Sequence, residues 1–244
     1  MTGDGSDLPY YDGRPVAVDG RGWALLMASL ALAFAVLTLT PPRGFPANLV
    51  PALLFAALPL AALRLAAGRH WRAPFRPVGL KEVGQMLLFG LVTLAGSALT
   101  GLLLSQVFEM TANPASGSMA APSAGGLAAA LLPTLPQLLG EELLGVLPFL
   151  AVLWLCVSRF GLSRRAGIGI GLVVSALIFG AAHLPTYGWN WPQALLGIGV
   201  ARVLLTLAFV ATRNLWVSTG AHVVNDWSGF LLIYVVGPMP IAPE

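Results

Sequence analysis

The sequence is poor in charged residues. Of its 244 residues, 13 are Lys or Arg and 10 are Asp or Glu, which makes 9% in all, whereas soluble domains carry about 25%. Hydrophobic residues make up 57%, and the mean hydropathy is +0.82. These values exclude an ordinary soluble domain and predict an integral membrane protein.

Cysteine and the motifs of several common enzyme classes are also scarce or absent. The single Cys156 excludes an internal disulfide framework. The sequence has no GxSxG, P-loop or dinucleotide fingerprint, so serine hydrolase, ATPase and oxidoreductase functions have no support. The net charge of +3 is small and scattered among loops, so we expect no nucleic-acid partner.

Seven apolar runs are present, each of about 18 residues or more, the length that crosses a bilayer as a helix. The fourth is too long for one plain helix and contains Pro133, Pro136 and Pro148, so we expect a short re-entrant or interfacial piece before the span proper. The sequence thus predicts an all-α fold, a multi-pass bundle of about seven or eight transmembrane helices in the cell membrane, surrounded by lipid. The seven runs are 23–40, 47–68, 84–108, 127–158, 166–183, 193–212 and 215–236.

The chain divides into four parts by composition. Residues 1–22 are rich in Gly, Asp and Pro and are expected to form a disordered tail. Residues 23–77 should hold two N-terminal transmembrane helices, residues 78–237 a membrane core, and residues 238–244 a C-terminal tail.

Polar residues inside the apolar runs are few. A charge near the bilayer centre costs at least about 2.5 to 3.5 kcal/mol on insertion scales, so such residues usually face a bundle interior and mark function. Phe179 and His183 are four residues apart, as are His222 and Asp226, so each pair shares one helix face. The pattern predicts a polar pocket inside the membrane where three helices converge. The polar residues in question are Glu141, Glu142, His183, Arg202, His222, Asn225 and Asp226.

The adjacent Glu141 and Glu142 point about 100° apart on a helix. They cannot fill the same role, so we expect one to do chemistry and the other to hold structure. Neither has a Lys or Arg within one turn, so their partners must come from other helices. For these two residues a functional interpretation is favoured.

The other polar residues also have structural interpretations. His183 can be an interfacial residue beside an aromatic belt. His222 and Asp226 can be a hydrogen-bonded pair that packs two helices together. Arg202 can extend along its aliphatic stem to a lipid headgroup.

Three motifs in order resemble those of the CAAX prenyl protease and bacteriocin-processing family, the CPBP or Abi family of intramembrane proteases. That family has EExxxR, FxxxH and HxxxN or HxxxD on three successive helices. Here the motifs read EELLGV at 141–146, FGAAH at 179–183 and HVVND at 222–226. The resemblance implies an enzyme, a membrane-embedded endopeptidase that hydrolyses a peptide bond in a peptide or lipidated protein substrate at or in the membrane.

The resemblance and the side-chain chemistry together suggest roles for the residues. Glu141 and His183 would activate a water molecule, because a carboxylate in a dry pocket suits a general base. His222 would donate to the oxyanion of the tetrahedral intermediate, and Asp226 can donate only when protonated. The residues expected to support this set are Glu142, Phe179, Arg202 and Asn225.

A metal site is an alternative, since two Glu, two His and an Asp can hold a divalent ion such as zinc. The sequence lacks HExxH, so we predict a site that is metal-independent or weakly metal-dependent, with no cofactor.

One position departs from the family pattern, because Val146 stands where the family has arginine. We therefore hypothesise that Arg202 supplies the cation from a neighbouring helix. The departure also leaves open a catalytically impaired member that acts in bacteriocin immunity or as a partner of a membrane protein. A proton-coupled transporter with the carboxylates as relay groups is a third alternative.

Overall fold

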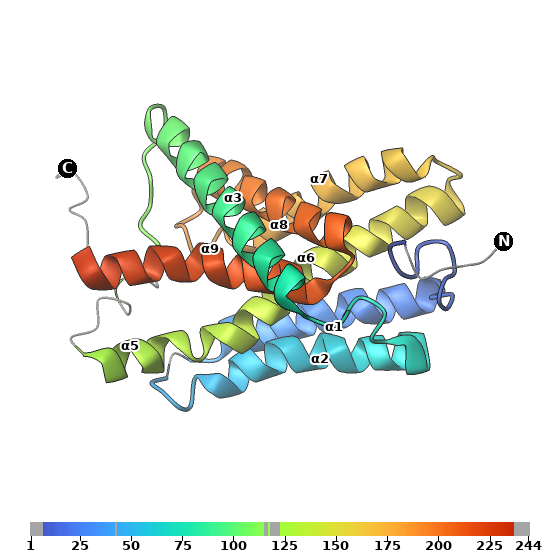
Figure 1. Cartoon of the computed structure of the whole chain (residues 1–244), viewed down its shortest axis with the longest axis horizontal. Coiled ribbons are helices and arrows are strands. Elements are labelled where there is room, and N and C mark those ends of the chain that lie inside the picture. Colours follow the sequence, from blue (N-terminus) through green and yellow to red (C-terminus); the bar gives the residue numbers. More distant parts are fainter. Residues whose placement is uncertain (1–6, 42, 115–116, 118–122, 237–244) are drawn as a thin grey trace.

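The computed structural model of the protein is a bundle of helices (Figure 1). The structure describes residues 7–41, 43–114, 117 and 123–236, and within these residues every regular element is a helix. The all-α fold predicted from the sequence is confirmed. The elements are α1 (Gly20–Leu39), α2 (Leu49–Ala67), η1 (Gly68–His70), α3 (Leu80–Ser105), α5 (Ala124–Leu131), α6 (Thr134–Trp154), η2 (Leu155–Arg159), α7 (Arg164–Ala182), η3 (Gln193–Ile198), α8 (Gly199–Thr212) and α9 (Leu215–Val236).

Six helical segments among the described residues are long and apolar enough to cross a membrane. They match the first six apolar runs of the sequence. The seventh run forms α9, which has 22 residues but is not among the six, because His222, Asn225 and Asp226 interrupt its apolar sequence. α9 packs instead against α3, α6 and α8. The polytopic helical bundle is thus confirmed, with six such segments and α9 as a further long helix.

The proline-rich fourth run breaks into two helices. α5 ends at Leu131, and α6 begins at Thr134 directly after Pro133. Proline suits the start of a helix because its φ is already helical and the first amides need no partner within the helix. A short helix therefore precedes the long one, and the two glutamates lie two turns into α6.

α6 lies at the centre of the bundle. It contacts α1, α2, α7, α8 and α9. In the most apolar stretch of the segment from α5 to η2, 72% of the residues are buried, whereas in the most apolar stretch of α3 the buried share is 17%. α3 instead exposes large aliphatic side chains such as Leu99 and Leu102, as expected of a helix that faces lipid. The carboxylates of α6 are therefore placed in the protein interior.

A sharp connection brings α8 and α9 together. Arg213 ends α8 with a left-handed backbone at φ 55°, and the Asn214 side chain caps α9 by accepting a hydrogen bond from the Trp216 amide at 3.1 Å. The same Asn214 oxygen accepts from the Arg76 amide at 3.1 Å, which ties the connection to the segment before α3. Arg202 on α8 and His222 on α9 both contact Glu142 of α6.

The segment before α1 is ordered, which corrects the expectation of a disordered tail for its described part. Leu8, Tyr10 and Tyr11 are buried. The Tyr10 hydroxyl donates to the His70 carbonyl at 2.8 Å, and the Ser158 hydroxyl donates to the Tyr11 carbonyl at 2.6 Å. A few aromatic side chains with distant partners thus outweigh a composition that is typical of disorder.

The first helix also starts earlier than the sequence indicated. Asp19 caps α1 by accepting from the Gly22 amide at 2.8 Å, so the helix begins at Gly20 rather than at residue 23. The first six residues of the predicted N-terminal tail and the whole predicted C-terminal tail, 238–244, lie outside the described residues.

Asp7 anchors the N-terminal segment to the start of α7. Its carboxylate accepts hydrogen bonds from the Arg164 guanidinium, from the Tyr11 hydroxyl at 2.7 Å and from the Leu8 amide at 2.7 Å. Partial burial acts to raise the pKa of Asp7, but the hydrogen bonds outweigh it and hold the pKa below its usual range. The carboxylate therefore stabilises the folded state above its unfolded pKa, and this contribution is lost as the pH falls through the folded pKa.

Asp7→Asn is expected to lower the free energy of unfolding by less than about 1 kcal/mol at neutral pH, because the side chains of the Arg164–Asp7 ion pair are 40% and 38% exposed. The difference from the wild type should vanish in acid, below the folded pKa. Thermal unfolding in detergent over a pH series measures it. Asp12→Asn, which removes an ion pair within the segment itself, is the control, and a difference that does not change with pH would contradict the prediction.

Candidate active site

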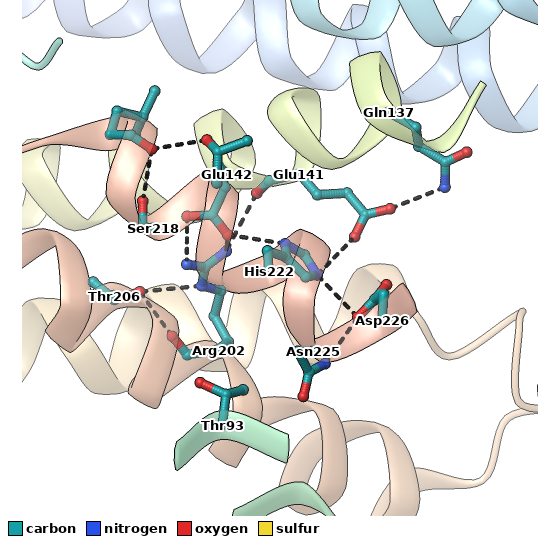
Figure 2. A network of polar contacts seen from close by, with 12 residues as sticks. Thr93, Gln137, Glu141, Glu142, Arg202, Thr206, Ser218, His222, Asn225 and Asp226 are labelled. Carbon is teal, nitrogen blue, oxygen red and sulfur yellow. Dashed lines mark hydrogen bonds and ion pairs between the residues drawn. The ribbon is translucent and has the colours of Figure 1, made fainter. Parts of the chain in front are cut away.

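The centre of the candidate site is an ion pair between Glu142 of α6 and Arg202 of α8 (Figure 2). Both side chains are 0% exposed. The guanidinium Nη1 and Nη2 donate to the two carboxylate oxygens of Glu142 at 2.8 and 3.0 Å, which is the paired geometry that makes Arg–carboxylate contacts strong. Arg202 does not extend to a headgroup, so the interpretation as a lipid-facing arginine is wrong.

The surroundings of Arg202 hold it in place. Its Nε donates to the Thr206 hydroxyl at 3.1 Å, and its Nη1 also donates to the Glu141 carbonyl at 3.5 Å. A Cβ atom on Gly145 would lie 2.7 Å from the guanidinium, so this position needs glycine for the arginine to approach α6. Val146 is wholly buried nearby in the apolar core. The cation beside the motif glutamate thus comes from α8, as the sequence led us to hypothesise.

His222 of α9 is oriented by the same glutamate. Its Nδ1 lies 2.9 Å from Glu142 Oε1, and because an ionised carboxylate only accepts hydrogen bonds, Nδ1 carries the proton in this contact. The other ring nitrogen, Nε2, lies 3.7 Å from both Glu141 Oε2 and Asp226 Oδ1. These two distances exceed a hydrogen bond, so His222 and Asp226 are not the directly bonded packing pair that the sequence allowed.

Glu141 faces away from the ion pair. Its carboxylate accepts a hydrogen bond from Gln137 Nε2, one turn earlier on α6, at 3.0 Å. Figure 2 shows the side chain between Gln137 and His222. Glu141 is 12% exposed, whereas Glu142 is 0% exposed. The two adjacent glutamates therefore have the different environments that their helical positions predicted.

Asp226 and Asn225 form a pair at the edge of the site. Asn225 Nδ2 donates to Asp226 Oδ1 at 2.8 Å, which directs this carboxylate oxygen between the amide and His222 (Figure 2). The Asn225 Oδ1 atom is buried and has no hydrogen-bond partner among the residues that the structure describes. Asn225 thus contacts the motif aspartate although it lies one position before it.

His183 ends α7 as its C-cap residue. Its Nδ1 lies 2.8 Å from the Phe179 carbonyl, and because a carbonyl only accepts hydrogen bonds, Nδ1 carries the proton in this contact. The ring also packs on Phe179, with 4.6 Å between centroids. Phe179 in turn lies 5.2 Å from the Arg202 guanidinium and 6.4 Å from the His222 ring. The phenylalanine of FxxxH therefore packs between the histidines and the arginine.

One cavity of about 880 Å³ joins these side chains. Such a volume lies in the range of about 300 to 1,000 Å³ that ligand pockets occupy. Glu142 is not among the residues that line it. The polar residues of the site that line the cavity are Gln137, Glu141, His183, Arg202, His222, Asn225 and Asp226.

The sequence did not lead us to two side chains of this network, Gln137 and Thr206. Each lies four residues from a residue that the sequence did identify, Gln137 before Glu141 and Thr206 after Arg202. Because residues at this spacing share a helix face, a search for polar side chains one turn from each buried charge would have found both.

The described residues contain no group of three or more His, Cys, Asp or Glu side chains arranged to hold a metal ion. The absence of a cofactor stays a prediction. It is tested by chelation: loss of activity in a chelator, restored by zinc, would overturn it.

Comparison with known proteins agrees with the motifs. Residues 123–228 match the family model of the Rce1-like type II CAAX prenyl endopeptidases, a stretch that runs from α5 into α9 and contains every site residue named above. No curated protein and no solved structure matches the chain. The match confirms the family that the motifs indicated: residues 123–228 belong to the CPBP, or CAAX-protease, family of membrane proteases.

Proposed function

We propose that the protein is a membrane-embedded endopeptidase that hydrolyses a peptide bond near a lipidated cysteine, with a water molecule activated by Glu141 and His183. The observation that carries the proposal is that Glu141, His183, His222 and Asp226 line a single cavity. They come from α6, α9 and the end of α7. All four lie in the stretch that matches the CAAX prenyl endopeptidase family.

The fixed tautomer of His183 supports its role beside Glu141. With the Nδ1 proton directed at the Phe179 carbonyl, Nε2 can accept a hydrogen bond from a water molecule in the cavity. Glu141 takes the other proton of that water as its oxygen attacks the substrate carbonyl carbon. The proton then passes from Glu141 to the leaving amine nitrogen as the C–N bond breaks, and the products are a free amine and a carboxylic acid, which releases the second water proton to solvent.

His222 would stabilise the tetrahedral intermediate. Glu142 holds Nδ1, so the ring presents Nε2 to the cavity, where an Nε2–H group can donate to the developing oxyanion. Preorganised donors of this kind are worth about 2.7 to 4 kcal/mol each. Asp226, directed by Asn225, lies on the same side of the ring and would stabilise a positive charge on it.

The alternative of a catalytically impaired member rested on the missing arginine at Val146. In the structure Arg202 pairs with Glu142. The valine at position 146 is therefore no argument for a catalytically impaired protein. No observation on the described residues favours a transporter over a hydrolase.

The test is cleavage by the detergent-solubilised protein of a panel of peptides that end in Cys-a-a-X, with and without an isoprenyl group on the cysteine. We expect the wild type to cleave at least one of them, and His183→Ala to be slower by about a hundredfold or more. His70→Ala is the matched control, because His70 lies outside the cavity lining and, among the described residues, its ring forms a hydrogen bond with Arg69. No cleavage by the folded wild type across the panel would contradict the proposal.

A further inference from the structure

We propose that Arg43 binds the free C-terminal carboxylate of the peptide substrate and thereby sets which bond is cleaved. Arg43 lies in the connection between α1 and α2, outside the stretch that matches the family. The proposal rests on the proposed function, because it assigns one end of the same cavity to one end of the substrate.

Arg43 lines two adjoining cavities. One is the large cavity that contains Glu141 and His222, and the other is a smaller one of about 180 Å³. The smaller cavity is walled mainly by aliphatic side chains, including Val36, Val50 and Leu54. The aliphatic stem of Arg43 can therefore pack on this wall while the guanidinium remains available at the junction.

The other arginine of the large cavity cannot fill this role. Arg202 has its Nε, Nη1 and Nη2 groups engaged by Thr206 and Glu142 and is 0% exposed. Arg43, by contrast, is exposed and forms no ion pair or hydrogen bond with any residue that the structure describes. Among the described lining residues it is therefore the arginine that can take an external anion.

A polar group beside Arg43 also lacks a partner. Asn48 lines the same cavity, and its Oδ1 atom is buried without a hydrogen-bond partner among the described residues. A buried acceptor without a donor is unfavourable. The last peptide N–H of a bound substrate would supply such a donor, next to the carboxylate that Arg43 would bind in the bidentate geometry typical of arginine.

The charges of the cavity fix the direction of the peptide. Glu141 and Asp226 repel a terminal carboxylate, whereas Arg43 attracts it. In a substrate that ends in Cys-a-a-X, three extended residues follow the cysteine and span roughly 10 Å. A carboxylate held at Arg43 would thus place the bond after the cysteine roughly 10 Å from Arg43, inside the cavity that both groups line.

An exposed arginine at the end of a membrane helix can also bind a lipid phosphate, so the experiment must separate two anions. We would compare cleavage of one peptide in two forms, with a C-terminal carboxylate and with a C-terminal carboxamide. For the wild type we expect KM to be about tenfold lower for the carboxylate form. Arg43→Gln should raise KM for the carboxylate form alone, with kcat unchanged. Arg64→Gln removes an exposed arginine from the last turn of α2 and should leave the ratio as in the wild type.

The result that overturns the inference is an acid-to-amide ratio in Arg43→Gln equal to that of the wild type. An effect of Arg43→Gln that follows the content of anionic lipid in nanodiscs, for both peptide forms alike, would also overturn it and assign Arg43 to a headgroup. If the wild type cleaves neither peptide, the proposed function fails. The inference about Arg43 is then tested by fluorescence binding of the same two peptides. A preference for the carboxylate form that is lost in Arg43→Gln supports the inference, and equal affinity of the wild type for both forms refutes it.

Discussion

Arg202→Leu is expected to lower the free energy of unfolding by about 3 to 5 kcal/mol, because it leaves Glu142 buried without its cation. Glu142 and Arg202 are both 0% exposed and share two hydrogen bonds, so water cannot replace the lost partner. Thermal or denaturant unfolding of the detergent-solubilised protein measures the change. Activity should fall as well, since His222 depends on Glu142 for its orientation.

Two second-site changes test the physical reason for that loss. Arg202→Leu combined with Glu142→Leu should recover most of the stability, because removing both charges leaves no unpaired ion, but it should remain inactive. Arg202→Leu combined with Val146→Arg should recover stability and some activity, because position 146 lies one turn after Glu142 on the same helix face. Unfolding of Arg202→Leu at the wild-type midpoint would show that the ion pair does not stabilise the fold.

Glu141→Gln and Glu142→Gln are expected to fail in different ways although the residues are adjacent. Glu141→Gln removes the proposed general base, so kcat should fall by about 10² to 10⁴ while the unfolding midpoint stays close to that of the wild type. Glu142→Gln leaves Arg202 buried without a counter-charge, so the free energy of unfolding should fall by about 3 to 5 kcal/mol. The measurement is kcat and the unfolding midpoint for both variants in the same detergent.

Each variant serves as the control for the other, because the chemical change and the helix are the same. Retention of kcat within tenfold in Glu141→Gln would exclude this residue as the base. Wild-type stability in Glu142→Gln would exclude a structural role for the second glutamate. Equal loss of stability in both variants would contradict the division of roles that the cavity lining and the exposures of 12% and 0% support.

The sequence predicted the helices well, because long apolar runs leave a membrane chain few alternatives to helix. It failed on the N-terminal segment for a physical reason. Tyr10 bonds the His70 carbonyl and Asp7 bonds Arg164, partners 60 and 157 positions away in the sequence. The amino-acid composition of a segment carries no information about contacts with residues far away in the sequence. It therefore could not reveal the partners of these side chains.

For the candidate site, the sequence predicted which polar residues gather in one pocket better than it predicted the contacts between them. Helical spacing separated Glu141 from Glu142, and the lack of a local cation pointed to Arg202. Spacing could not tell that His222 Nδ1 bonds Glu142 rather than Asp226, because that choice depends on how α6 and α9 pack. The close approach of Arg202 to Gly145 likewise depends on the packing of α6 against α8.

Glu142 belongs to α6, but its partners Arg202 and His222 belong to α8 and α9. During synthesis the chain emerges from its N-terminus, so α6 enters the membrane before either partner exists. His222 cannot acquire its orientation until α9, the last described helix, has packed against α6. Under the proposed function, activity can therefore begin only once α9 has packed, because a half-inserted chain would lack His222 and Asp226.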